Sequence, residues 1–259
     1  MKAYINELLK RTDLIKYLVI SGLKAQNKNS YLGFFWWLLD PLLQILIYYF
    51  VVVIVFQRGR GADYGIYLAT GLITWRWMST SVATATRSII SQSGIITQVY
   101  LPKVTFPICT VLSQMINFGF GLIVIALCFV FFQIKPGLAN VWLPFVISIQ
   151  FLFLLAIAMI IAYLSVFVRD MELLVTHLLR LWFYGSPVIW YADMVPERAR
   201  WILQINPVTT FLKSYRNIMI NNTAPDVMGL MFIGLVSMVA IFLLLYLYTN
   251  YEHKIIKAL

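Results

Sequence analysis

Two arginines could contact a charged substrate within an apolar environment. Arg76 lies between Trp75 and Trp77, and Arg180 follows His177 by three positions, so His177 and Arg180 share one face of a helix. An arginine at either place could bind a phosphate or pyrophosphate group. The alternative is an interfacial arginine whose charge reaches the headgroups while aromatic neighbours anchor it. Both interpretations stay open for Arg76, and binding is favoured for Arg180.

Aromatic side chains make up 16% of the chain and could form a sugar-binding surface. Their commoner role in membrane proteins is a belt at the two interfaces, and we favour that role for any single residue. Sugars also stack on such rings, so part of the set could line a conduit. The candidate aromatic conduit residues, which would act beside Arg76, His177 and Arg180, are Trp36, Trp37, Tyr48, Tyr49, Trp75 and Trp77.

Several kinds of chemistry are excluded by what the sequence lacks. It contains no G-x-x-x-x-G-K-[ST] loop, so the chain cannot hydrolyse ATP by that route alone. His177 and His253 are far apart, and no His/Cys cluster has metal-ligand spacing. Apart from Asp40 near a span, the acids cluster at ends and loops, whereas ion-coupled transporters usually need carboxylates within the bundle. We therefore expect no catalytic site, cofactor or metal in this chain. A secondary transporter, a channel and a membrane-embedded glycan enzyme are all disfavoured.

The composition indicates a single all-α polytopic membrane domain over residues 1–259. The chain has 61% hydrophobic and 12% charged residues, with a mean hydropathy of +0.84. Soluble domains are nearer about 45–50% apolar and about 25% charged, so lipid must cover the excess apolar surface. At roughly 20 residues a span, this length holds about five to seven helices and no separate soluble domain. The net charge of +10 fits membrane orientation and anionic headgroups, and no nucleic-acid partner is expected.

Six spans are predicted within a transmembrane bundle of residues 34–251. Asp40-Pro41 fits an N-cap followed by proline at the first helical position, so the regular part of the first span is expected to begin there. Gly185, Ser186 and Pro187 should break the fifth span near one membrane face. The predicted spans cover about residues 34–56, 64–83, 104–132, 141–168, 173–191 and 228–251.

Three segments are too polar or too patterned to span. Residues 1–33 carry an apolar stripe opposite a basic face, typical of an amphipathic helix in the membrane interface, with a frayed terminus as the alternative. Residues 84–103 are rich in Ser, Thr and Gln with one apolar side, which predicts a short helix outside the bilayer. Residues 192–227 are mixed, and within them residues 201–220 contain Pro207, Lys213 and Arg216, which suits a re-entrant or interfacial pair of short helices rather than a full span.

The distribution of Lys and Arg orients the chain. With both termini in the cytoplasm, the inner segments carry eleven basic residues, against seven, Arg216 among them, in the outer loops. Six of the eleven lie in residues 1–33, and charges near the first span usually dominate the topology. We therefore predict a protein of the cytoplasmic membrane with both termini inside and residues 252–259 as a cytoplasmic tail.

The order of these elements resembles the ABC-2-type permeases that export polysaccharides, including O-antigen and wall teichoic acid permeases. The likeness covers nearly the whole chain, and the start at Asn29, Gln44-Ile45 and Tyr48 is more similar to the teichoic acid branch. One arginine often found before the Leu-Gly pair is absent, because Gln26-Asn27-Lys28 stands there instead. The residues that carry the resemblance are Asn29-Ser30-Tyr31-Leu32-Gly33 with Trp36 or Trp37, Pro41-Leu42-Leu43-Gln44-Ile45, Gly71-Leu72-Ile73 with Trp75, Tyr100-Leu101-Pro102, Ser186-Pro187-Val188-Ile189-Trp190, Asn206-Pro207 and Tyr215-Arg216.

The resemblance implies a homodimer of this chain with two copies of a separate ATP-binding subunit, which would hold ATP and Mg. The cargo would be a glycopolymer on undecaprenyl pyrophosphate, either wall teichoic acid or, alternatively, an O-antigen or capsule polysaccharide. The first helix and the 84–103 helix would dock on the ATPase, and replacing Tyr100, Leu101 and Lys103 should uncouple or release it. The expected ATPase-interface residues are Tyr17, Arg87, Gln98, Tyr100, Leu101, Pro102, Lys103, Arg169 and Asp170.

Overall fold

The computed structural model describes residues 2–26, 30–57, 64–98, 101–133 and 137–258, and every regular element in these ranges is helical. Short 3-10 segments and one π-helical segment lie between or beside longer helices. The 3-10 segments are η1 (Gly33–Phe35), η3 (Ile90–Gln92), η4 (Leu138–Trp142), η5 (Ala192–Met194) and η6 (Glu197–Ala199), and the π-helical segment is η2 (Phe50–Val55). Those α-helices are α1 (Lys2–Lys10), α2 (Thr12–Gln26), α3 (Trp36–Tyr49), α4 (Tyr64–Ala85), α5 (Ser93–Gln98), α6 (Thr105–Phe131), α7 (Leu143–Phe167), α8 (Met171–Tyr184), α9 (Arg200–Ile205), α10 (Pro207–Met219) and α11 (Val227–Ala258).

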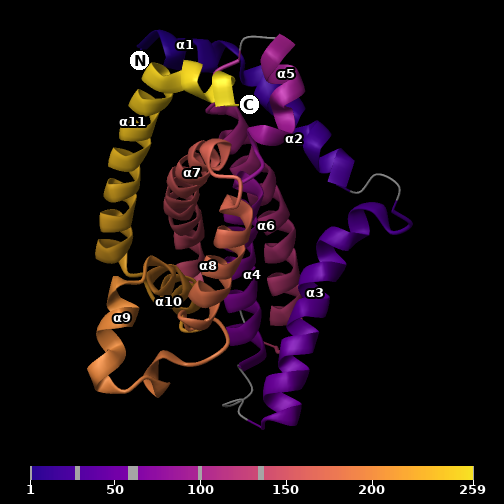
Figure 1. Cartoon of the computed structure of the whole chain (residues 1–259). Helices are drawn as coiled ribbons and strands as arrows, with labels where there is room; N and C mark the ends of the chain where they lie inside the picture. Colours follow the sequence, from indigo (N-terminus) through magenta and orange to yellow (C-terminus); the bar gives the residue numbers. More distant parts are fainter. Residues whose placement is uncertain (1, 27–29, 58–63, 99–100, 134–136, 259) are drawn as a thin grey trace.

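The long helices run between two ends of the bundle (Figure 1). Helix α4 lies in the middle and packs against α3, α6, α7, α8 and α10, while α11 packs along α7. The start of α1, the helix α5 and the end of α11 lie together at one end, which we call the terminal end (Figure 1). The helix α9 lies at the opposite end, and both chain termini are at the terminal end.

Four segments are long and apolar enough to cross a membrane: Gly33–Val55, Thr105–Phe131, Leu138–Phe167 and Val227–Ile255. They correspond to the first, third, fourth and sixth predicted spans. Helix α4 has 22 residues but is less apolar, because neighbouring helices rather than lipid cover most of it. Helix α8 has only 14 residues and ends at Gly185. The second and fifth predicted spans thus fall short on composition and on length, respectively.

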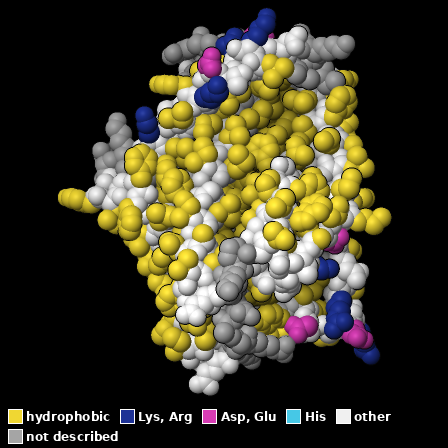
Figure 2. All heavy atoms as spheres, turned by 180° about the vertical axis from the view of Figure 1, so that it is seen from behind, with side chains coloured by type: hydrophobic (Ala, Val, Ile, Leu, Met, Phe, Trp, Pro, Cys, Tyr) yellow, Lys and Arg dark blue, Asp and Glu magenta, His cyan; other side chains and the backbone are white. Residues whose placement is uncertain are grey.

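Exposed apolar side chains cover the middle of the molecule, and charged side chains gather toward its two ends (Figure 2). These exposed hydrophobic residues are distributed over α3, α6, α8 and α11. Soluble monomers rarely expose a continuous apolar surface of this kind. The surface therefore agrees with the composition in indicating a chain that lipid or partner chains surround.

The buried apolar residues form two clusters. The larger one surrounds α4 and includes residues of α6, α7, α8 and α10. The smaller one lies at the terminal end and joins parts of the chain that are far apart in sequence. We call it the terminal cluster, and its buried members are Tyr4, Ile89, Ile96, Leu101, Val104, Phe106, Met159, Ala162, Leu244, Tyr248 and Ile255.

The start of the first span differs from the prediction. Helix α3 begins at Trp36 with Phe35 as its N-cap residue, and Pro41 lies buried inside the helix. The prediction that Asp40 caps the helix is therefore wrong, because the Asp40 carboxylate accepts a hydrogen bond from Arg76 of α4 instead. A proline inside a helix removes one backbone hydrogen bond. Packing of α3 against α4 and α6 compensates for that loss.

The non-spanning segments form helices, with some changes. The amphipathic N-terminal segment forms two helices, α1 and α2, which meet near Thr12, where the side chain bonds to the carbonyl of Leu9 (2.5 Å). The polar 84–103 segment is divided, since α4 continues to Ala85 and is followed by η3 and α5. The predicted pair of short helices before the last span is confirmed as α9 and α10.

Candidate functional site

A cavity of about 390 Å³ lies between α3, α4 and α6, and we call it the aromatic hollow. Four of the predicted conduit residues meet here, although they come from two different helices. Trp36 and Trp37 of α3 line this cavity together with Arg76 and Trp77 of α4. Its main lining residues are Trp36, Trp37, Asp40, Arg76, Trp77, Gln114, Asn117 and Phe118.

The polar groups of the aromatic hollow are suited to binding a sugar or a phosphate. Arg76 and Asp40 form an ion pair across the cavity and are both partly exposed. Trp77 stacks on Phe118 with ring centroids 4.5 Å apart. Among the described residues, the indole N–H of Trp77 and the Oδ1 of Asn117 are buried without a hydrogen-bond partner. Buried polar groups usually have partners, so these two atoms are exceptions in the wall of the cavity, where Asp40 and Arg76 provide accessible polar groups.

A second cavity of about 490 Å³ adjoins the first toward the terminal end, and we call it the terminal hollow. The two share the lining residues Thr84 and Gln114, so they are neighbours in the bundle. Tyr17 of α2 and Arg87 after α4 line the terminal hollow. The terminal hollow therefore carries a cationic side chain, and the aromatic hollow lies next to it.

The remaining predicted conduit residues line neither of the two hollows. Tyr48, Trp75 and Arg180 line a separate cavity of about 300 Å³ between α3, α4 and α8. Trp75 and Trp77 are two positions apart on a helix and so point to nearly opposite sides. Tyr49 packs near Phe132, with ring centroids 6.4 Å apart, and His177 is exposed on α8. Helix α4 therefore separates the predicted conduit residues into two groups.

The predicted ATPase-interface residues fall into exposed and buried groups. Tyr17, Arg87, Arg169 and Asp170 are exposed. Arg87 Nε lies 2.6 Å from a carboxylate oxygen of Glu172. Arg87 and Arg169 also line one groove of about 370 Å³ between the end of α7, the start of α8 and η3. These side chains can reach a partner protein directly.

The other members of that set are placed differently. Leu101, Pro102 and Lys103 are buried in the terminal cluster and its surroundings, with Lys103 only 1% exposed. They cannot touch a partner directly in this structure, so any part they play in coupling is indirect. Tyr100 lies outside the described residues, as does the side chain of Gln98 at the end of α5.

At the opposite end, a network around Arg216 holds the irregular segment that follows α8. Arg216 of α10 is 7% exposed, and it donates to the carbonyls of Pro187 (2.6 Å), Val188 (2.8 Å) and Tyr67 (3.3 Å). Its guanidinium also lies 3.4 Å from the centroid of the Tyr67 ring. Arg216, which the sequence analysis counts among the basic residues of the outer loops, is thus a buried donor to backbone carbonyls.

The rest of the irregular segment is held by hydroxyl and amide groups. Tyr64 and Tyr67 of α4 donate to the carbonyls of Ile189 (2.7 Å) and Trp190 (2.8 Å). Asn206 donates to Ser186 Oγ (2.8 Å), and its oxygen accepts from the indole of Trp182 and caps α10. Non-helical backbone at membrane depth needs such partners from protein. The motif residues were visible in the sequence, but their mutual pairing was not, because the partners are up to 149 positions apart.

Comparison with known proteins gives a consistent match along the chain. The ABC-2 type transporter family matches residues 13–220. The O-antigen export system permease protein RfbA of Klebsiella pneumoniae is 31% identical over 212 residues, which cover 82% of each chain. The protein of the same name from Myxococcus xanthus is 31% identical over 237 residues, 91% of each chain. The matched region includes both hollows and the Arg216 network.

Proposed function

Because the chain belongs to the ABC-2 type transporter family, we propose that it is the permease subunit of an ATP-driven exporter of a lipid-linked polysaccharide. The observation that carries the proposal is the 31% identity over 91% of this chain to a protein named as an O-antigen export permease. The aromatic hollow supports it, because a lining of aromatic rings with an ion pair suits a glycan.

The energy for export would come from a separate ATPase. The sequence has no phosphate-binding loop of its own, so an exporter of this family needs a second subunit that binds ATP and Mg. We propose two ATPase copies on a homodimer of this chain. The exposed residues Tyr17, Arg87, Arg169 and Asp170 at the terminal end would dock them, and Gln98, Tyr100, Leu101, Pro102 and Lys103 would adjoin that contact.

In the proposed topology the terminal end faces the cytoplasm. Both chain termini lie there, together with the basic helices α1 and α2, which would rest in the inner membrane interface (Figure 1). Helices α4 and α8 would serve as the second and fifth of six membrane crossings, and α9 and α10 would re-enter from the outer side. The protein would then be a multi-pass protein of the cytoplasmic membrane.

The cargo we propose is a glycopolymer on undecaprenyl pyrophosphate. A pyrophosphate cannot cross hydrocarbon unaided, and Arg87 in the lining of the terminal hollow suits an anionic group. The names of the relatives favour an O-antigen-type polysaccharide. The Asn29-Ser30-Tyr31-Leu32-Gly33 start and Tyr48 are more similar to wall teichoic acid permeases. Export of one polymer but not the other by the purified complex decides between the two.

The proposed docking surface leads to a direct prediction. Reversing two charges with Arg87→Glu and Arg169→Glu should weaken binding of the ATPase subunit by at least about tenfold, because both line the exposed groove at the terminal end. Arg198→Glu is the matched control, since Arg198 is exposed on η6 at the far side of the chain. Affinity is measured with labelled ATPase and detergent-solubilised permease. Unchanged affinity in the double variant would place the docking surface elsewhere.

The proposed function is tested by assembly with an ABC-type ATPase subunit, for which the genes beside that of this chain are the first place to look. We expect the two proteins to co-purify and the ATPase to turn over ATP faster in the complex than alone. A permease that purifies without any bound ATPase, together with unaltered ATP turnover on mixing, would refute the exporter function.

A further inference from the structure

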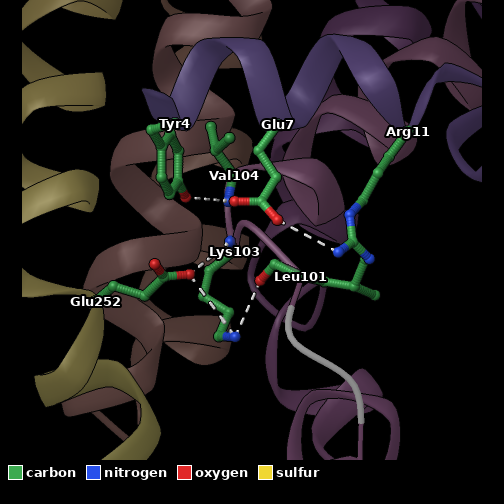
Figure 3. Close-up of polar contacts among 7 residues, drawn as sticks. All are labelled: Tyr4, Glu7, Arg11, Leu101, Lys103, Val104 and Glu252. Carbon is green, nitrogen blue, oxygen red and sulfur yellow. Dashed lines mark hydrogen bonds and ion pairs between the residues drawn. The ribbon is translucent and has the colours of Figure 1, made fainter. Parts of the chain in front are cut away.

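An ion pair is buried in the terminal cluster, where three distant parts of the chain meet. Lys103 Nζ lies 3.7 Å from Glu252 Oε1 of α11, and the side chains of the two residues are 1% and 11% exposed. The same carboxylate oxygen accepts from the backbone N–H of Lys103 (3.2 Å), while Nζ also donates to the carbonyl of Leu101 (2.9 Å). Figure 3 shows these contacts converging on the short segment 101–104 that precedes α6.

The N-terminal helix joins the same segment from another side. The hydroxyl of Tyr4 accepts from the backbone N–H of Val104 (3.4 Å), and Tyr4 itself is 6% exposed (Figure 3). The Glu7–Arg11 pair lies beside it along α1, but both of those side chains are about one third exposed. The segment 101–104 is therefore held by α1 and by the end of α11.

The Lys103–Glu252 contact differs in its chemistry from the surrounding apolar contacts. Apolar contacts are non-directional, whereas a buried charge that loses its partner is strongly unfavourable. Glu252 holds both the main chain and the side chain of one residue, which fixes the register between α11 and the segment. One turn earlier in α11, Tyr248 donates to the carbonyl of Met159 in α7 (2.9 Å). The contact thus continues into a second membrane helix.

We propose that the Lys103–Glu252 pair is a positioning device that makes α1, the segment 101–104 and the end of α11 move as one block during the transport cycle. This inference rests on the proposed function, in which the ATPase docks beside the segment 101–104, and it adds that ATP hydrolysis displaces that segment. Movement of the segment reaches α6 directly, because that helix begins at Thr105. Through Glu252 it also reaches α11, so the last span takes part in opening the conduit.

The first test separates coupling from folding. Glu252→Gln keeps an oxygen for the Lys103 N–H but removes the charge, Lys103→Met removes the cation, and the double variant is neutral at both positions. For folded Glu252→Gln and Lys103→Met complexes, polymer exported per ATP hydrolysed should fall at least about fivefold, and Glu252→Gln should keep ATPase binding. The double variant should recover thermal stability relative to Lys103→Met, since it removes both charges of the buried pair. Lys254→Met, an exposed change on the same helix, should leave the ratio unchanged.

A purely structural role for the pair predicts another result. Lower yield or melting temperature with a wild-type export ratio in folded Glu252→Gln protein would overturn the proposal. A wild-type complex that shows no ATP-driven export at all would instead refute the proposed function. The two failures are therefore distinguishable.

A second measurement follows the block itself and needs only the permease, the ATPase and ATP. Spin labels are attached at Lys10→Cys in α1 and Lys257→Cys in α11, after Cys109 and Cys128 are replaced by alanine. Lys10 and Lys257 are both exposed. We expect one narrow distance that ATP leaves unchanged in the parent protein and that ATP shifts or broadens in Glu252→Gln. A shift on ATP addition in the parent, or no change in Glu252→Gln, would contradict motion as one block held by this pair.

Discussion

Replacing Arg216 with methionine is expected to lower the apparent melting temperature of the detergent-solubilised protein by about 10 °C. Methionine fills similar apolar space but leaves the carbonyls of Pro187, Val188 and Tyr67 without their donor. Hydrogen bonds from a charged donor contribute about 1.5–3 kcal/mol each, and their loss is not fully additive. We therefore expect a cost of about 3–5 kcal/mol, measured by thermal unfolding.

Two comparison variants identify the cause of the Arg216 effect. Arg216→Lys keeps the charge but lacks the fork that reaches three carbonyls, so it should recover only part of the loss. Lys213→Met removes an exposed cation from the same helix and should change the melting temperature little. If Arg216→Met melts like the parent protein, the network does not hold the segment after α8.

Replacing Gly71 with alanine should have the second-largest effect, by crowding the same network from α4. An added Cβ would lie 2.5 Å from the carbonyl oxygen of Val188 and 2.5 Å from Arg216 Nη2. The first of these atoms is backbone and cannot move aside without shifting the segment after α8. Overpacking of this kind costs about 1–3 kcal/mol, so we expect the melting temperature to fall by about 5 °C.

Gly119→Ala is the matched control for this change. Gly119 is also inside a long helix, but an added Cβ there meets nothing within 4 Å. Since alanine favours helix over glycine by up to about 1 kcal/mol, this variant should melt at the same temperature or slightly higher. A Gly71→Ala protein as stable as Gly119→Ala would show that α4 and the segment after α8 are not in close contact.

The sequence was sufficient to predict the class of fold and the apolar spans. Long apolar runs such as Thr105–Phe131 stand out because lipid requires them to be apolar around most of their surface. Helix α4 is different, since protein surrounds it and its polar residues, such as Thr70 and Ser81, are buried among other helices. A hydropathy threshold that identifies lipid-facing spans therefore does not identify α4.

The candidate site was only partly predictable, because pairing in space depends on packing. Arg76 and the neighbouring tryptophans were identified by residue type, and four of the predicted conduit residues line one hollow. The resemblance predicted Lys103 at the interface with a partner, yet a carboxylate 149 positions away lies beside the buried lysine. The pairing of Arg216 was not predicted either, since no local pattern reveals that its partners are backbone carbonyls.

Reconstitution of the permease with its ATPase in sealed vesicles tests the central claim most directly. Short-chain glycopolymer on undecaprenyl pyrophosphate is placed on the ATPase side, and its appearance on the other side is followed with a lectin or antibody against the glycan. We predict transfer that requires ATP and stops when the ATPase carries an inactive ATP site. Transfer at the same rate without ATP, or no transfer of either O-antigen or teichoic acid polymers by an active complex, would contradict the account.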